Sequence, residues 1–448
     1  MFTTVRAGFL LLAATLLAAP HTPAGQAQAA ATAPTGKFLH LSDVHFDPFA
    51  NPDPKFIAKL NGARVDDWEA LFRAGAQSPM PGKKQDSNFT LFASTLADAQ
   101  SQGPYDYVLY SGDYLSHDFV ASMQAYLPNP QDRTAFAAKT AAFVNLMIGR
   151  SFPNAPLVAA LGNNDSSCWD YQLTPDADLL AGVATSLPVL RGNPAATADF
   201  AKGGYYLVSH PTVAGQDIAV LGVFWSRKYR DGCNPGAPNP AQAQLAWLQT
   251  ALAAEAKAGR KVTLLMHILP GIDGFASSPS QQGTTVNEWT DDLAYLTAFQ
   301  GLVAQYQAIL VGGYAGHTHM DEFRVMPGLA VRVGPAITPR DGNRPAYTVF
   351  RYDPATGGAL GYRTRVLGSV WGDGYDFNKA YGLKRYDAAS LQALAGRVMS
   401  DPATRAKFQG YYSAGNPVSA SRAQYWRYFG CALTQLAPTG YGSCVAGK

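Results

Sequence analysis

The chain of 448 residues carries little charge for its length. Asp, Glu, Lys and Arg together make up 15% of its residues, whereas 47% are hydrophobic. This composition excludes an intrinsically disordered chain and allows a large buried core, in one large domain or in two to three ordinary ones. The formal net charge is only +3, and Lys and Arg form no continuous block. The sequence therefore gives no indication of a nucleic-acid-binding surface.

Long apolar runs are also scarce. One run, Ala7–Ala19, follows Arg6, is too short to span a bilayer, and ends at Pro20. With the small residues around position 29 it is typical of a signal peptide, so we expect residues 1–29 to be removed and the protein to be exported, to the periplasm or the medium. An uncleaved anchor helix is the alternative. No later run is long enough to predict a transmembrane segment.

Cysteine occurs only four times, at spacings that match no Cys-type zinc site. An even number of cysteines in an oxidising compartment indicates disulfides. Of the three possible pairings we expect Cys168–Cys233 and Cys431–Cys444, with buried free thiols as the alternative.

What the sequence does contain is a short apolar run followed by a polar cluster, five times over. The runs end at residues 41, 110, 161, 266 and 311, and their length and flanks predict buried strands. Helix-period segments at 89–99, 135–148 and 241–258 lie between them, which predicts an α/β layered domain. Because ligands bind at the carboxyl ends of such strands, the five polar clusters should meet.

These clusters are rich in histidine and carboxylate. They contain five of the eight histidines, namely His45, His117, His267, His317 and His319. Imidazole and carboxylate groups are the natural ligands of zinc, manganese and iron. Two such ions close together can activate a water and bind both the attacking and the leaving oxygen of a phosphoryl group, using roughly seven ligands.

The five clusters, in this order, resemble the calcineurin-like metallophosphoesterase superfamily. Within it, the chain is most similar to acid sphingomyelinase-like phosphodiesterases, through residues 41–48, 112–118, 336–339 and 343–347. The resemblance implies a sandwich of two mixed β-sheets flanked by helices, over residues 37–375. It also implies a small helical C-terminal extension over residues 376–448, whose aromatic side chains we expect to pack on the core; a lipid-facing surface is the alternative.

The resemblance further implies a role for each cluster residue. It gives seven ligands to two divalent ions: Asp43, His45 and His319 for one, Asn163, His267 and His317 for the other, and Asp113 between them. Zinc is the expected metal, with manganese or iron as alternatives. His117 would bind the phosphate and act as general acid towards the leaving alkoxide. Asp47 and Asp118 are candidates for orienting histidines or are surface acids, and Asp165 is expected to be a structural turn acid.

Two features depart from the family pattern. Asn164 stands where the family has a histidine, and an amide can hydrogen-bond to phosphate but cannot titrate. The same Gly-Asn-Asn-Asp variant resembles endopolyphosphatases. Roughly a dozen residues separate the expected cleavage site from Asp43, so we expect the saposin-like domain of acid sphingomyelinases to be missing.

The expected activity is hydrolysis of a phosphodiester bond in a small-molecule or lipid substrate by metal-activated hydroxide. A sphingomyelinase-like or nucleotide phosphodiesterase is the first interpretation. An endopolyphosphatase acting on phosphoanhydride bonds is a second, and a non-catalytic metal- or phosphate-binding protein is a third. The head group, the native metal and the oligomeric state are left open.

Overall fold

A computed structural model describes residues 1–3, 35–75, 78–171, 177–226, 236, 240–289, 295–415 and 423–447. The expected signal peptide lies outside these residues except for its first three positions, and so does Cys233. The predictions of a cleaved signal and of a Cys168–Cys233 disulfide therefore stay predictions. Among the described residues, no helix is both long enough and apolar enough to cross a membrane.

The first sheet has six strands in the order β12-β11-β10-β1-β2-β3. These strands are β1 (Gly36–Leu41), β2 (Tyr107–Tyr110), β3 (Leu157–Ala159), β10 (Ala346–Tyr352), β11 (Ala359–Leu367) and β12 (Trp371–Asp376). Strands β1, β2 and β3 run parallel, whereas β10 pairs antiparallel with both β1 and β11. The three parallel strands are buried along almost their whole length, as their continuous apolar sequences require.

The second sheet has the order β4-β5-β6-β7-β9-β8. Its strands are β4 (Tyr206–Ser209), β5 (Gln216–Val220), β6 (Lys261–Leu265), β7 (Leu310–Ala315), β8 (Glu322–Met326) and β9 (Leu329–Val333). Strands β5, β6, β7 and β9 are parallel, and β4 and β8 are antiparallel edges. The two sheets meet through aromatic rings: Tyr314 of β7 lies edge-on to Phe38 and Phe350 of the first sheet, with centroids 5.4 and 5.3 Å away. The predicted fold of two mixed sheets with flanking helices is confirmed.

Helices flank the sheets, and those over residues 89–102, 130–151 and 241–258 coincide with the three helical segments that the sequence predicts. The N-terminal half contributes α1 (Pro54–Gly62), α2 (Val65–Ala74), α3 (Phe89–Gln102), α4 (Phe119–Tyr126), α5 (Pro130–Ser151), α6 (Ala177–Ser186) and α7 (Pro194–Gly203). They are followed by α8 (Ala241–Ala258), α9 (Gly274–Ser277) and α10 (Tyr295–Tyr306). Asn88 starts α3 by accepting the Leu91 N–H, and Gly259, at φ 68°, ends α8 in the left-handed conformation that glycine favours.

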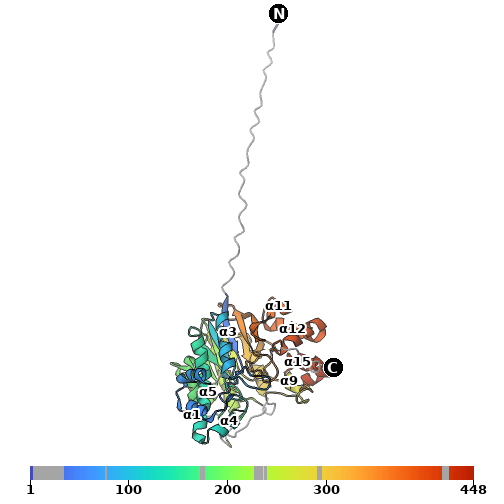
Figure 1. Cartoon of the computed structure of the whole chain (residues 1–448). Helices are drawn as coiled ribbons and strands as arrows, with labels where there is room; N and C mark the ends of the chain where they lie inside the picture. Colours follow the sequence, from blue (N-terminus) through green and yellow to red (C-terminus); the bar gives the residue numbers. More distant parts are fainter. Residues whose placement is uncertain are drawn as a thin grey trace. The chain divides into compact units, whose positions relative to one another are not determined.

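The C-terminal helices pack against this body, on the side opposite α1, α4 and α5 (Figure 1). They are α11 (Phe377–Tyr381), α12 (Ala388–Ser400), α13 (Pro402–Tyr412), α15 (Trp426–Ala432) and α16 (Pro438–Val445). Leu391 and Leu394 of α12 are fully buried in the same core as the first sheet. Tyr412 stacks on Phe429 with centroids 4.6 Å apart, and both are buried. These aromatic side chains therefore pack on the core.

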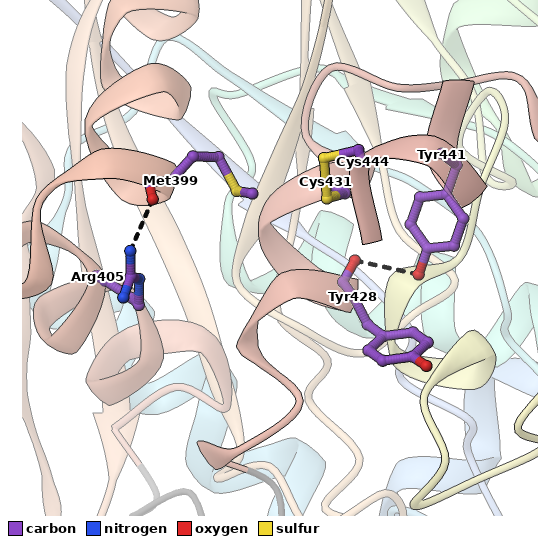
Figure 2. The surroundings of a disulfide bond; sticks show 6 residues. All are labelled: Met399, Arg405, Tyr428, Cys431, Tyr441 and Cys444. Atoms are coloured by element: carbon purple, nitrogen blue, oxygen red, sulfur yellow. Dashed lines mark hydrogen bonds between the residues drawn. A yellow bond between two sulfur atoms is a disulfide. The ribbon is translucent and has the colours of Figure 1, made fainter. Parts of the chain in front are cut away.

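A disulfide joins the last two helices. Cys431 of α15 and Cys444 of α16 are bonded, which confirms this predicted pair (Figure 2). Beside it, the Tyr441 hydroxyl donates to the Tyr428 carbonyl oxygen at 3.2 Å. The bond therefore fastens the C-terminal helix to its neighbour.

Candidate metal centre

Strand ends from both sheets meet at one place. The loop after β1 runs beside the loop after β2, because the N–H of Asp43 donates to Gly112 O (3.1 Å) and that of His45 to Asp113 O (3.0 Å). In the second sheet the Gly316 N–H donates to His267 O at 2.9 Å. The fold thus brings together the five polar clusters, as the strand-end pattern predicts.

The backbone of this region is unusual. Among the described residues, eight that are not glycine have a positive φ, and five of these are predicted ligands: Asp43 (50°), His45 (44°), Asp113 (60°), His317 (82°) and His319 (64°). Residues with a side chain rarely adopt this conformation, and it persists only where the surrounding structure enforces it. Strained residues of this kind cluster at functional sites, so these loops are a candidate functional site.

Asp113 lies at the centre of the cluster. Its Oδ2 is 3.2 Å from Nε2 of His45 and 3.1 Å from Nε2 of His267. Nε2 of His319 is 3.0 Å from Nε2 of His45 and 3.6 Å from Oδ1 of Asp43. All five side chains are buried.

Asn163 occupies the other end of the cluster. Its Nδ2 donates to Asp170 Oδ1 at 2.7 Å, which turns Oδ1 towards the histidines. Asn163 Oδ1 lies 3.0 Å from Nε2 of His267 and 2.8 Å from Nδ1 of His317. The structure thus brings together all seven predicted ligands.

The nitrogen and oxygen atoms that face one another in this cluster are arranged to bind cations. Nδ1 of His45 faces Leu115 O at 2.9 Å, and Nδ1 of His267 faces Ser111 O at 2.8 Å. A carbonyl oxygen can only accept, so both Nδ1 atoms carry a proton, and in the neutral form of each ring Nε2 presents a lone pair. These lone pairs point at the carboxylate of Asp113, and two acceptors at this distance repel each other unless a positive charge lies between them. The arrangement is that of ligands around metal ions.

The pKa values of two of these histidines support the same conclusion, although burial lowers the pKa of a third, His45. Although burial lowers it, the Asp113 carboxylate raises the pKa of His267 to about 9. Burial also lowers the pKa of His319, but the nearby carboxylates of Asp341 and, to a smaller extent, Asp43 raise it to about 9. The cluster therefore attracts positive charge, which protons supply where metal ions do not.

Two groups of three residues bring ligand atoms close enough for one ion each. They are His45, His117 and His319, and Asp43, Asp113 and His267. The ring of His117 stacks on that of His45, with centroids 4.0 Å apart. His117 therefore lies against the ligands predicted for one ion, and the predicted division of the seven ligands between two ions stays a prediction.

Asp86 orients His117, and sequence reasoning missed this role. Its Oδ1 lies 2.9 Å from His117 Nδ1, and its Oδ2 accepts the His117 backbone N–H at 2.8 Å. Burial raises the pKa of Asp86, but the hydrogen bond with the His117 side chain outweighs burial and holds this pKa well below its usual range. The two acids suggested for such a role do other things: Asp118 pairs with Arg340 at 3.3 Å, and Asp47 accepts the Phe49 N–H.

Asn164 and Asp165 hold the Asp113 loop. Asn164 donates to both carboxylate oxygens of Asp113, from its backbone N–H and from Nδ2, each at 2.9 Å. Asp165 accepts backbone N–H groups from both the second and the third cluster. Its expected role as a turn acid agrees with these bonds.

Further acids contact the histidines from outside the motifs. Glu288 Oε2 lies 3.2 Å from Nε2 of His317, and Asp341 Oδ2 lies 2.9 Å from Nδ1 of His319. The Tyr171 hydroxyl also lies 3.3 Å from Nε2 of His317. No local motif surrounds these three residues, so only the folded chain identifies them.

The family described as Calcineurin-like phosphoesterase matches residues 36–321. The chain is similar to acid sphingomyelinase-like phosphodiesterase 3b of Homo sapiens, at 25% identity over 93% of this chain and 91% of that protein. It is also similar to a cyclic GMP-AMP phosphodiesterase of Mus musculus, at 23% identity over 96% and 95%. An endopolyphosphatase of Schizosaccharomyces pombe is 27% identical over 64% of this chain and 48% of that protein.

Among solved structures, a dimetal phosphatase from Danio rerio matches with a TM-score of 0.41 at 10% identity. The match covers 75% of this chain and 98% of that one.

Proposed function

The chain belongs to the calcineurin-like phosphoesterase family, and we propose that it is an exported hydrolase of phosphodiester bonds that uses two divalent metal ions. The observation that carries this proposal is the convergence of seven side chains whose acceptor atoms face one another around Asp113. The names of relatives that align over more than nine tenths of the chain support phosphodiesters as the substrate class.

The ions would be held by Asp43, His45, Asp113, Asn163, His267, His317 and His319, and we expect zinc. Bound there, they would supply hydroxide from water at neutral pH and neutralise charge on the phosphoryl oxygens. The chain's own contribution is to fix these ligands. Neighbouring carbonyl oxygens and acids, such as Ser111 O and Asp341, decide which ring nitrogen carries the proton and which is left to bind.

His117 is the proposed general acid. Asp86 accepts from its Nδ1, so Nε2 is the nitrogen available to the substrate. The His117 side chain is 25% exposed, whereas those of the buried histidines around it are at most 8% exposed. A proton held there can pass to the leaving alkoxide as the P–O bond breaks. Asn164 cannot take over this role, because an amide does not titrate and because its backbone N–H and its Nδ2 already donate to Asp113.

The activity test uses bis-p-nitrophenyl phosphate with the metal-loaded protein. We expect release of p-nitrophenol that a chelator abolishes and zinc or manganese restores, with elemental analysis giving two ions per chain. Asp113→Asn should lose both ions and activity together. A protein that binds two ions but cleaves no diester with any of these metals would be the non-catalytic binding protein instead.

An endopolyphosphatase is the second candidate. Asn164 and the similarity to the Schizosaccharomyces pombe enzyme favour it. Incubation with long-chain polyphosphate, followed by gel analysis, tests this activity, and unchanged chain length would exclude it. Parallel assays on sphingomyelin in detergent and on nucleotides separate the two kinds of diester.

Export is part of the same proposal. The Cys431–Cys444 disulfide supports an oxidising compartment. Expression of the full chain in a bacterial host, followed by fractionation and N-terminal sequencing, should find mature protein that begins at Ala30 outside the cytoplasm. Full-length protein retained in the cytoplasm would contradict it.

A further inference from the structure

A row of buried polar side chains leads from the middle of β1 to Asp43. Nε2 of His40, in β1, lies 3.1 Å from Ser111 Oγ. Ser111 Oγ lies 2.7 Å from Ser42 Oγ, and the Ser42 hydroxyl bonds to Oδ2 of Asp43. All four side chains are at most 2% exposed, so this hydrogen-bond chain is sealed from bulk solvent.

The number of protons available fixes the direction of the chain. A carboxylate can only accept, so Ser42 donates its single hydroxyl proton to Asp43. Towards Ser111 the Ser42 oxygen can then only accept, which uses the single proton of Ser111. Ser111 Oγ therefore accepts from His40, whose Nε2 carries the proton. His40 is the first of three donors, and the chain ends on a proposed metal ligand.

The other nitrogen of the His40 ring has no such use. Among the described residues, Nδ1 of His40 finds no hydrogen-bond partner. The ring also packs tightly against Gly334, where a Cβ would lie 2.8 Å from Cε1 of His40. Burial, and then the positive charge of Arg332, lower the pKa of His40 to about 3, so the ring stays neutral. A buried polar atom without a partner costs stability that an apolar residue here would avoid, which points to a role for Nε2.

The chain engages one oxygen of Asp43 and leaves the other facing the cluster. Oδ2 accepts from Ser42, whereas Oδ1 accepts the His317 backbone N–H at 3.0 Å and lies 3.6 Å from Nε2 of His319. Gly316 closes over the contact, because a Cβ there would overlap Ser42 Oγ and Asp43 Oδ2. The carboxylate is thus held from behind in one orientation.

Building on the proposed function, we propose that His40 is a positioning residue of the metal centre. Acting through Ser111 and Ser42, it fixes the Asp43 carboxylate with Oδ1 turned towards the ion. A hydroxyl that accepts a hydrogen bond becomes a stronger donor, so the His40 proton strengthens the Ser42–Asp43 bond two contacts away. Groups that orient a metal ligand in this way typically contribute about 10–100-fold to metal affinity.

Zinc affinity, measured by competition with a chromophoric chelator, tests this role without requiring catalysis. His40→Leu removes the first donor and should weaken the binding of one of the two ions about tenfold. His40→Gln, whose amide N–H can reach the position of Nε2, should restore the affinity. His210→Leu is the matched control: it removes another buried histidine and leaves two N–H groups without their acceptor, yet both affinities should stay at wild-type values.

A double-mutant cycle separates action through the serines from a general effect on the fold. Ser42→Ala removes the last donor and should weaken zinc binding at least as much as His40→Leu. Adding His40→Leu to Ser42→Ala should then cause no further loss. Ser111→Ala, a smaller change, interrupts the chain at its middle and should match His40→Leu. Wild-type affinity in both His40→Leu and Ser111→Ala would overturn the proposal, as would losses that multiply in the double variant.

Two results distinguish a failure of the chain from a failure of the proposed function. Zinc binding without cleavage of any diester refutes the hydrolase, and the affinity comparison still decides the role of His40. A wild type that binds no divalent ion overturns both. Nuclear magnetic resonance of the metal-free protein with ¹⁵N-labelled histidine needs neither metal nor substrate: a proton on Nε2 of His40 supports the chain, and a proton on Nδ1 alone would refute it.

Discussion

Replacing Asp165 by Asn should lower the stability of the fold and loosen the loop that contains Asp113, a proposed metal ligand. Its Oδ2 accepts the N–H groups of Gly162 (2.7 Å) and Asp113 (3.1 Å), and its Oδ1 accepts those of Tyr114 (2.7 Å) and Leu115 (3.1 Å). One buried carboxylate thus fastens the turn after β3 to the loop after β2. The loop that it fastens contains the proposed bridging ligand.

The size of the effect follows from these four bonds. Asparagine keeps one acceptor oxygen, so two of the four N–H groups would face an NH₂ group. A buried N–H without a partner costs about 1–3 kcal/mol, so Asp165→Asn should lower the free energy of unfolding by about 2–6 kcal/mol. Asp165→Ala leaves all four without a partner, and its loss of about 4–12 kcal/mol is comparable to the ~5–15 kcal/mol that keeps a protein folded.

Urea unfolding of the metal-loaded variants, with elemental analysis of the folded protein, measures both consequences. Asp353→Asn is the matched control, because this turn acid accepts the Ala355 N–H at 2.9 Å through an oxygen that asparagine keeps. Its unfolding free energy should stay within about 0.5 kcal/mol of wild type. The reasoning is refuted if Asp165→Asn matches the control and retains two ions per chain.

Three further changes test other parts of the structure. Asp86→Asn should lower kcat for diesters with alkyl leaving groups about 10–100-fold and affect bis-p-nitrophenyl phosphate less, because p-nitrophenolate leaves without a proton; equal losses on both substrates would contradict an orienting role. The double variant Cys431→Ser with Cys444→Ser opens a loop of sequence separation 13 and should lower the unfolding free energy by about 3 kcal/mol, seen as a lower urea midpoint. Burial lowers the pKa of His210 to about 4, so its neutral form stabilises the fold above pH 6.5, and this contribution is lost as the pH falls from there towards 4. His210→Asn keeps an acceptor for the two N–H groups that donate to Nδ1 of His210. As the pH falls from 6.5 towards 4, the unfolding free energy of this variant should therefore decrease less from its value at neutral pH than that of wild type does.

The sequence predicts the fold and the meeting of the clusters because both depend on local patterns. Each ligand-bearing loop directly follows a buried strand, and the carboxyl ends of parallel strands share an edge. His45 and His319 are therefore recognisable from the few residues around them. The predicted ligand set follows from the resemblance of these short motifs to the family's motifs, so it requires no knowledge of distant contacts.

The sequence does not predict the residues that orient these proposed ligands. Asp86 stands just before a helix, where an acid has an ordinary explanation as a cap, although Asn88 is the residue that caps α3. Glu288 and Asp341 reach their histidines from loops with no motif. Asp47 and Asp118 lie nearer to the histidines in sequence, but the chain turns them towards a backbone N–H and towards Arg340. Proximity along the chain does not predict which acid reaches a ring.

If the proposed metal ligands are correct, protons and metal ions bind at the same positions in this site, and the pH dependence of metal binding has a definite direction. With pKa values of about 9, His267 and His319 are protonated at neutral pH while no metal is bound. A metal ligand must be the neutral imidazole, so binding the ions has to expel these protons. Apparent metal affinity should therefore rise as the pH increases towards about 9. Titration calorimetry at pH 7 in buffers of different ionisation enthalpy should detect about two protons released per chain from these rings, in addition to the proton that metal-bound water gives up. Asp341→Asn, which removes the largest contribution to the raised pKa of His319, should reduce that release to about one. Metal binding without proton release at pH 7 would mean that these nitrogens already present their lone pairs in the free protein, and that something other than protons separates the facing acceptors.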